Sequence, residues 1–148
     1  MKLQFTIGVF GIIFNEKMEV LLCHRTDYDL WNLPGGRLED GEAPWGGVIR
    51  EIKEETGLDA KILKLVGIYN KSDKNEIAFS FLCEVVNGSV AVNDEADKIQ
   101  YFAFNDLPKN TVPKQVERIK DVLENPDKVI LKVQTSKSAI ELVKEGKL

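Results

Sequence analysis

Histidine and cysteine are scarce in this sequence, which has a single histidine, His24, and two cysteines, Cys23 and Cys83. A zinc site needs about four nitrogen or sulfur ligands, so the chain has too few of them for a conventional one. Both cysteines stand inside apolar segments, which predicts two reduced, buried thiols and favours a cytoplasmic location. The lone histidine is expected to be a partly exposed strand residue rather than a catalyst. Any metal chemistry therefore has to come from oxygen ligands.

Long apolar runs are also missing. No segment reaches the roughly 18–20 consecutive apolar residues that cross a bilayer, so we expect no membrane span. The N-terminus has one early lysine, Lys2, but no small-residue cleavage site after an apolar block, so no signal peptide is predicted. With 148 residues, of which 43% are hydrophobic and 30% charged, the chain is expected to fold as one domain over residues 1–148.

The net charge of −4 is spread unevenly along the chain. Residues 1–108 contain 11 Lys and Arg against 18 Asp and Glu, whereas residues 109–148 contain 9 against 6. A protein that holds a polyanion through charge alone should show the opposite sign, so the composition argues against a nucleic-acid partner. Carboxylates gathered near a phosphate substrate make sense only if cations lie between them.

The pattern of apolar residues predicts one mixed α/β or α+β domain. The first two predicted strands flank a polar turn and are expected to pair as a hairpin. The run Pro34-Gly35-Gly36 is a strong breaker, which predicts a sharp turn or a close backbone approach. Strands are expected over 3–14, 19–25, 60–69, 77–86, 99–104 and 129–133, and helices over 44–56, 113–123 and 138–144.

The first predicted helix runs from Pro44, which suits a first helical position, to a stop at Gly57. Its apolar stripe is expected to consist of Trp45, Ile49 and Ile52, which recur at helical spacing.

The same helix carries Glu51, Glu54 and Glu55 at i, i+3 and i+4, so their three carboxylates lie on one face. Like charges this close repel one another, which favours a bound cation, and dense oxygen ligands suit Mg²⁺ or Mn²⁺ better than zinc or copper. Arg50 lies beside Glu51, where it can orient and partly neutralise a carboxylate. On its own, however, a row of glutamates is more often a solvated face. The register of the surrounding residues decides between the two interpretations.

That register resembles the Nudix box, Gly-x5-Glu-x7-Arg-Glu-U-x-Glu-Glu-x-Gly-U, where U is aliphatic. Its fixed positions are filled by Gly36, Glu42, Arg50, Glu51, Ile52, Glu54, Glu55, Gly57 and Leu58. Weaker similarity extends from residue 20 to residue 108. The resemblance implies a Nudix fold, an α/β/α sandwich with a mixed β-sheet. It also implies hydrolysis of a nucleoside diphosphate linked to another group, X.

By this resemblance, Glu51, Glu54 and Glu55 bind divalent cations, Mg²⁺ or Mn²⁺, with help from the backbone carbonyl of Gly35. The cations bridge phosphate oxygens of a nucleotide-type substrate and lower the pKa of an attacking water. A nearby carboxylate then takes the proton of that water.

The catalytic residues implied on the helix are Arg50, Glu51 and Glu54. The general base varies within the family, so it is either a helix glutamate, Glu51 or Glu55, or else Glu95. Glu95 belongs to an acidic loop at 94–97, and such a loop is commonly just solvated.

Two arginines are candidates for binding the substrate. Arg25 ends the second predicted strand, where relatives often place a phosphate-contacting basic residue, and the alternative is an ordinary strand-end charge. Arg37 follows the double glycine and faces either the phosphates or a partner in a surface salt bridge.

The substrate itself is left open by the sequence. A nucleoside triphosphate or its oxidised form is favoured over ADP-ribose, a sugar nucleotide or a dinucleoside polyphosphate. The rival hypothesis is a non-catalytic nucleotide sensor. A homodimer is also expected, because dimers are common among relatives.

Two departures from the family pattern stand at the helix start. Ala43 is a poor N-cap, and Gly46-Gly47 indicates a softer helix start or a close backbone approach.

Overall fold

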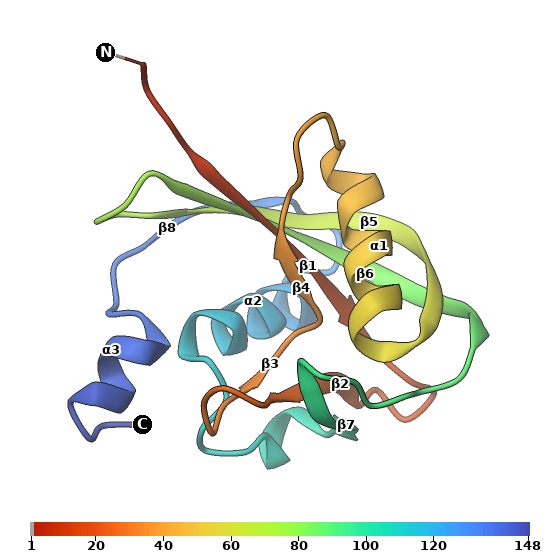
Figure 1. The fold of residues 1–148 in the computed structure, drawn as a ribbon. Helices are drawn as coiled ribbons and strands as arrows, with labels where there is room; N and C mark the ends of the chain where they lie inside the picture. Colours follow the sequence, from red (N-terminus) through yellow and green to blue (C-terminus); the bar gives the residue numbers. More distant parts are fainter. Residues whose placement is uncertain (1) are drawn as a thin grey trace.

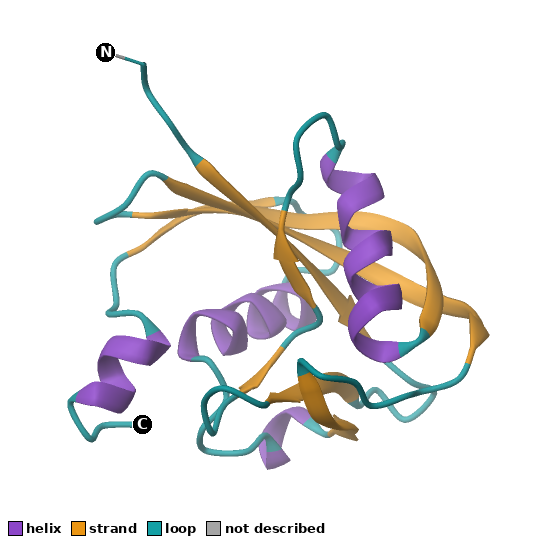
Figure 2. Ribbon diagram, in the orientation of Figure 1, coloured by secondary structure: helices purple, strands orange, loops and turns teal. Residues whose placement is uncertain are grey.

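The computed structural model describes residues 2–148, which form eight strands, three α-helices and one 3-10 helix (Figures 1 and 2). In chain order they are β1 (Thr6–Ile13), β2 (Val20–Arg25), β3 (Trp31–Asn32), β4 (Gly35–Arg37), α1 (Pro44–Thr56), β5 (Leu58–Lys71), β6 (Glu76–Gly88), β7 (Ala96–Phe102), η1 (Phe104–Asp106), α2 (Pro113–Glu124), β8 (Ile130–Gln134) and α3 (Ala139–Lys144). All the predicted strands and helices are present, and the short β3, β4 and η1 are additional. None of the helices in this part of the chain has both the length and the hydropathy that crossing a bilayer requires.

The strands form two sheets. The larger sheet has the order β4-β1-β6-β5-β8, and the smaller has the order β3-β2-β7. β1 pairs in parallel with β6, and β5 pairs in parallel with β8, while the other pairings are antiparallel. The fold is therefore a mixed α+β domain, as predicted.

Both faces of the larger sheet carry a hydrophobic core, because successive residues of β1 point to opposite faces. On one face, Val9 and Ile13 of β1 belong to a cluster with Ile52 of α1. On the other, Ile12 belongs to a cluster with Ile119 of α2. The sheet is thus sandwiched between α1 and α2 (Figure 1), which is the layer arrangement predicted from the resemblance.

The predicted hairpin of β1 and β2 is wrong, although the turn between them was placed correctly. Asn15 closes that turn, because its Oδ1 accepts hydrogen bonds from the N–H groups of Lys17 at 3.0 Å and Glu19 at 2.9 Å. Beyond the turn, one bridge between Phe14 and Val20 joins the two segments. Both edges of β1 are occupied by β4 and β6, so β2 pairs with β3 and β7 instead.

Helix α1 begins at Pro44, as predicted, and Gly57 ends it with a φ of 82°, the left-handed conformation that glycine adopts without strain. The expected stripe needs one correction. Trp45 is 64% exposed, while Val48 and Ile52 are fully buried. The buried stripe therefore runs through positions 48, 52 and 56, and leaves the first turn of the helix outside the core.

The glycine pair at the helix start has a partial explanation. A Cβ at Gly47 would lie 2.6 Å from Cδ1 of Leu38 and 2.9 Å from Oε1 of Glu42, so a close approach requires glycine there. A Cβ at Gly46 would meet nothing within 4 Å, and nothing in the structure explains that residue. Ala43 makes no side-chain cap, as its residue type predicts.

Candidate functional site

The glycines of β4 lie against the acidic face of α1. A Cβ at Gly36 would come within 2.7 Å of Oε1 of Glu51, so a larger residue there would displace that carboxylate. The Glu51 side chain is only 12% exposed. Burial raises the pKa of Glu51, and the charge of Arg50 opposes that rise. The close approach predicted for the double glycine is therefore made to a glutamate of the box.

Arg50 holds the acidic side chains around it in place. Its Nε and Nη2 donate to the two carboxylate oxygens of Glu42 at 2.7 and 2.9 Å, a bidentate pair. Its Nη1 donates to Glu51 at 3.1 Å and to Glu54 at 3.0 Å. The hydrogen bond from Arg50 lowers the pKa of Glu42. One guanidinium thus orients three carboxylates, as the sequence predicted for at least one of them.

Glu55 differs from these neighbours, because within residues 2–148 its carboxylate forms no ion pair with a lysine or arginine. Its Oε2 accepts one hydrogen bond, from the N–H of Gly35 at 2.9 Å. Burial, with added repulsion from Glu51 and Glu95, raises the pKa of Glu55 from 4.5 to about 8. A half-buried carboxylate that ionises only at such cost is a strong candidate for binding a cation.

The loop before β7 brings Glu95 to the same place. Asn93 shapes this loop, because its Oδ1 accepts a hydrogen bond from the N–H of Glu95 at 2.9 Å. The Nδ2 of Asn93 donates to the backbone carbonyl of Glu55 at 2.6 Å. Thr26 ties the loop to β2 through a 2.8 Å hydrogen bond from its Oγ1 to the carbonyl oxygen of Asp94. Glu95 therefore has an exposed side chain on a loop that hydrogen bonds fix to α1 through Asn93 and to the end of β2 through Thr26.

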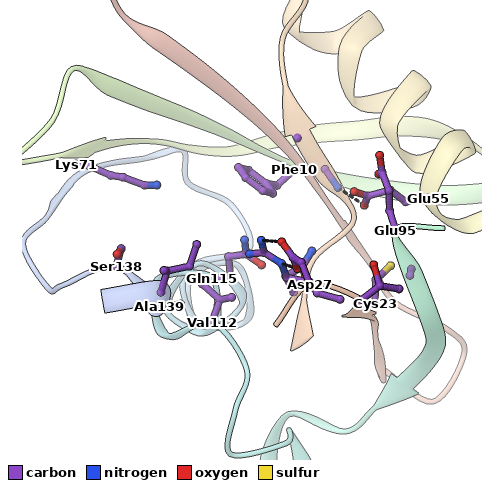
Figure 3. A pocket seen from close by; sticks show the side chains of 17 residues that line it. Phe10, Cys23, Asp27, Glu55, Lys71, Glu95, Val112, Gln115, Ser138 and Ala139 are labelled. Carbon is purple, nitrogen blue, oxygen red and sulfur yellow. Dashed lines mark hydrogen bonds and ion pairs between the residues drawn. The ribbon is translucent and has the colours of Figure 1, made fainter. Parts of the chain in front are cut away.

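Glu55 and Glu95 line one end of a pocket of about 590 Å³ (Figure 3), whereas Arg50, Glu51 and Glu54 are not among its lining residues. Figure 3 shows Glu55 and Glu95 at that end, and Lys71 and Ser138 at the opposite end. The lining residues are Phe10, Cys23, Arg25, Thr26, Asp27, Asn32, Gly35, Gly36, Glu55, Lys71, Glu95, Ala96, Val112, Gln115, Ser138, Ala139 and Ile140. A pocket of this volume accommodates a ligand the size of a nucleotide.

The two arginines expected to contact the substrate have different positions. Arg25 lines the pocket, and its Nε and Nη2 donate to the carboxylate of Asp27 at 2.8 and 2.6 Å. Arg37 is exposed on β4 and is not among the residues that line the pocket. Its backbone carbonyl accepts a 3.3 Å hydrogen bond from Arg50. The fold thus brings Arg25 to the pocket and places the Arg37 side chain outside it.

Both cysteines are buried and free, as predicted. Burial raises the pKa of Cys83 to about 12, and burial also raises the pKa of Cys23, which lines the pocket. His24 joins two carboxylates, with its Nε2 2.7 Å from Asp29 and its Nδ1 2.7 Å from Asp97. These hydrogen bonds, the one to Asp29 first, raise the pKa of His24. His24 thus anchors β2 to the segment that follows Glu95.

The donor chemistry at the glutamate end fits a divalent cation. The side-chain donors there are carboxylate oxygens, which hard cations such as Mg²⁺ prefer. In the part of the chain that the structure describes, no three His, Cys, Asp or Glu side chains already converge on one point. Arg50 holds Glu51 and Glu54, while Glu55 turns to the amide of Gly35. The negative charge of Glu55 is what a bound cation would offset.

Sequence reasoning missed several polar groups that the fold brings to the site. Asn93 was not singled out, although an asparagine in an acidic loop is a common turn-forming residue. Gln115 of α2 accepts a 2.6 Å hydrogen bond from the N–H of Leu33, which is 82 residues away along the chain, so no local pattern signals it. Asn32 also lines the pocket, and its Oδ1 is buried without a hydrogen-bond partner in the described chain.

Comparison with known proteins agrees with the resemblance carried by residues 36–58. A NUDIX domain model matches residues 4–124. A putative 8-oxo-dGTP diphosphatase of Bacillus subtilis (strain 168) is 32% identical over 144 residues, which cover 95% of this chain and 97% of that protein. An ADP-ribose pyrophosphatase of Methanocaldococcus jannaschii is 36% identical over 110 residues, which cover 70% of this chain and 64% of that protein. The crystal structure of an ADP-ribose pyrophosphatase from Streptococcus suis 89-1591 matches with a TM-score of 0.73 at 26% identity, over 88% of this chain and 100% of that one.

Proposed function

The chain belongs to the Nudix family of hydrolases and is a nucleotide pyrophosphohydrolase, and from this premise we propose its substrate class and the roles of its site residues. The bond that it cleaves is a phosphoanhydride in a nucleoside diphosphate linked to another group. The favoured substrate is a nucleoside triphosphate or its oxidised form. Nudix hydrolases generally need a divalent metal, and we assign Mg²⁺ or Mn²⁺ because these ions prefer carboxylate oxygens.

The observation that carries the proposal is the Glu55 carboxylate, which is half-buried beside Glu51 and Glu95 and is bonded to a single backbone amide. Glu51, Glu54 and Glu55 are the proposed ligands of the cation, together with the backbone carbonyl of Gly35. When bound, the cation offsets the charge of the substrate phosphates and makes the attacking water more acidic.

Two residues of the chain have further proposed roles, one in positioning carboxylates and one in accepting a proton. Arg50 keeps Glu51 and Glu54 in place through its 3.1 and 3.0 Å hydrogen bonds. Glu95 is the proposed general base, because it is exposed in the pocket beside Glu55, whereas Glu51 is held by Arg50. Glu95 takes a proton from the water as the water oxygen bonds to phosphorus. The bridging P–O bond breaks, and the leaving phosphate oxygen keeps the electron pair.

Side chains that line the pocket offer groups that suit a nucleoside. The Oδ1 of Asn32 has no hydrogen-bond partner in the described chain, and the Nε2 of Gln115 forms no hydrogen bond there either, since only its Oε1 is used. An acceptor and a donor on two amides match a nucleobase edge that presents adjacent N–H and C=O groups. Phe10, which also lines the pocket, adds an apolar ring.

The phosphates are expected between this region and the glutamates. Arg25, which lines the pocket, is the proposed phosphate contact, whereas Arg37 would reach only a part of the substrate that extends beyond the pocket. The relative that is similar over nearly its whole length is named a putative 8-oxo-dGTP diphosphatase, which supports an oxidised guanine nucleotide. ADP-ribose is the second candidate, because two similar proteins are named ADP-ribose pyrophosphatases.

The test is a hydrolysis screen of the purified protein with Mg²⁺ or Mn²⁺. The panel contains normal and oxidised nucleoside triphosphates, ADP-ribose, dinucleoside polyphosphates and sugar nucleotides, and released phosphate products are measured. We expect metal-dependent turnover, with the highest kcat/KM on a nucleoside triphosphate or its oxidised form. No metal-stimulated turnover on any member would contradict the proposed reaction. Nucleotide binding without hydrolysis, equal in the wild type and in Glu54→Gln, would instead indicate a sensor.

A further inference from the structure

His24, the single histidine of the chain, lies between two carboxylates. Its Nε2 is 2.7 Å from Oδ1 of Asp29, and its Nδ1 is 2.7 Å from Oδ1 of Asp97. The His24 side chain is only 13% exposed, and its ring packs edge-on against Trp31 with 5.1 Å between the ring centres. The proposed reaction gives this residue no role.

The two carboxylates determine which form of the ring fits between them. An ionised carboxylate only accepts hydrogen bonds, whereas a neutral imidazole has one N–H and one nitrogen lone pair. A neutral His24 would therefore point its lone pair at a carboxylate oxygen 2.7 Å away. The side chains of Asp29 and Asp97 are 87% and 51% exposed, which favours their ionised form. The charged imidazolium, which donates from both nitrogens, satisfies both partners.

The electrostatics favour the same form. Hydrogen bonding to Asp29 raises the pKa of His24, burial opposes that rise, and hydrogen bonding to Asp97 adds to it. The other titratable side chains near His24 on β2, on β7 and on the adjoining loops are Cys23, Arg25, Asp27, Tyr28, Lys98 and Lys109. Among them, Arg25 is paired with Asp27. The ring therefore keeps its charge to a higher pH than a free histidine and loses it as the pH rises further.

Asp97 is an extra residue where β2 and β7 lie side by side (Figure 1). His24 pairs with Lys98 and Arg25 pairs with Ala96, so the pairing skips Asp97 and a β-bulge forms there. The side chain of Asp97 is bonded to His24 instead. Glu95, the proposed general base, stands two residues before this bulge. The hydrogen bond from His24 thus fixes the segment that carries Glu95.

The other ring nitrogen fixes the loop that follows β2. Oδ1 of Asp29 accepts a second hydrogen bond, from Nδ2 of Asn110 at 3.0 Å. Within the same loop, the N–H of Arg25 donates to the carbonyl oxygen of Leu30 at 2.9 Å. Arg25 lines the pocket at the start of this loop. One imidazolium therefore links the two segments that bring Arg25 and Glu95 to the pocket.

We propose that charged His24 is a positioning residue of the active site. Its hydrogen bond to the bulge at Asp97 holds Glu95 in place, and its hydrogen bond to Asp29 holds the loop of Arg25. His24 does not line the pocket, so it acts through these residues. The proposal rests on the proposed function, since it takes Glu95 to be the general base. Loss of the His24 proton removes one of the two hydrogen bonds, so the contribution of His24 to turnover disappears as the pH rises.

The first experiment needs no hydrolysis. The chain has one histidine, so its ring-proton NMR signal is unambiguous, and it is followed from pH 5 to 10 in EDTA together with the amide signal of Glu95. We expect a His24 midpoint above 6.5 and a Glu95 amide that shifts with the same midpoint. Asp97→Asn should lower the His24 midpoint, while Asp127→Asn, at an exposed position before β8, should leave it unchanged. A midpoint at or below 6.5, or a Glu95 amide that does not follow it, would overturn the proposal.

The second experiment measures kcat with saturating Mg²⁺ from pH 6 to 10 for the wild type, His24→Leu, Asp97→Asn and Asp127→Asn. The ratio of wild-type kcat to that of His24→Leu should be ~10 below the His24 midpoint, because the base is then held only in the wild type. Above the midpoint the ratio should approach one. For Asp97→Asn the same ratio should reach one at a lower pH, and Asp127→Asn should match the wild type throughout.

The ratio separates positioning from a merely structural role, because pH effects on the metal-bound water and on Glu95 are common to both proteins and cancel. A ratio that stays constant with pH, or that equals one throughout, would overturn the role of His24 and leave the proposed function standing. No metal-stimulated turnover in the wild type would contradict the proposed function instead. The NMR titration would then still decide whether His24 holds the segment of Glu95.

Discussion

Asn93 and Glu55 are joined by a 2.6 Å hydrogen bond from the side-chain amide of Asn93 to the backbone carbonyl of Glu55. The Oδ1 of the same asparagine accepts from the N–H of Glu95 at 2.9 Å. One side chain thus connects the last turn of α1 to the loop that carries the proposed general base. The spacing of Glu55 and Glu95 depends on that connection.

Substitution of Asn93 should therefore impair turnover more than substrate binding. Asn93→Ala removes both hydrogen bonds, and we expect kcat to fall by ~10–100-fold with a smaller change in KM, because the base is no longer held in position. Asn93→Asp keeps the acceptor for the N–H of Glu95 but loses the donor to Glu55. Its kcat should therefore lie between that of the wild type and that of Asn93→Ala. Steady-state kinetics measure both parameters.

Asn87→Ala is the matched control, since Asn87 is exposed on β6. If Asn93→Ala retained the kcat of this control, Asn93 would not position the base. A loss of melting temperature in proportion to the loss of kcat would point to a purely structural role.

Glu55→Gln should lower turnover by at least ~10²-fold while leaving the fold intact. The amide oxygen of glutamine can still accept the hydrogen bond from Gly35, but the charge that would bind the cation is gone. Turnover is measured with saturating Mg²⁺, and the melting temperature is measured in parallel. A drop in melting temperature as large as the loss of activity would contradict the assignment of Glu55 to cation binding.

Arg50 offers a separate test, because it organises the box without contacting the proposed reacting atoms. Arg50→Met leaves Glu42, Glu51 and Glu54 to repel one another, so we expect a lower melting temperature in EDTA and at least ~10-fold lower kcat. Arg50→Lys restores the charge but not the bidentate geometry. It should recover much of the melting temperature and little of the kcat. Full recovery of kcat in Arg50→Lys would show that charge alone matters at this position.

The parts of the site that could be predicted from the sequence are those set by local geometry. Glu51, Glu54 and Glu55 share a face because the helix period places i, i+3 and i+4 together, whatever surrounds them. Likewise, the Pro44 start and the Gly57 stop depend on backbone preferences of single residues. These features require no knowledge of which elements meet in space.

The parts that could not be predicted depend on which elements meet. The turn at Asn15 looked like a hairpin, but β1 had other partners on both edges, so the pairing of β2 was decided elsewhere in the chain. The link from Asn93 to Glu55 spans 38 residues, and the hydrogen bond from Leu33 to Gln115 spans 82. Neither produces a periodic or local signal in the sequence.

Stability without metal should fall as the pH rises, because folding raises the pKa of Glu55 from 4.5 to about 8. Below about pH 4.5 the carboxyl is protonated in both states and imposes no cost. Between pH 4.5 and 8 the unfolded chain releases this proton first, so the folded state binds more protons and loses stability as the pH rises. Above pH 8 the cost is complete. Glu55→Gln cannot ionise and should escape it.

In EDTA at pH 9, we therefore expect Glu55→Gln to exceed the wild type in unfolding free energy by about 2 kcal/mol, less than the whole pKa shift implies because Glu55 keeps some contact with solvent. At pH 5 the two proteins should be nearly equal. Urea unfolding measures both, and Glu84→Gln, an exposed position on β6, controls for the loss of one acidic group. Adding Mg²⁺ at pH 9 should reverse the order, because the cation offsets the buried charge in the wild type only. If the difference in unfolding free energy between the wild type and Glu55→Gln stayed the same from pH 5 to 9, Glu55 would not be an uncompensated buried charge.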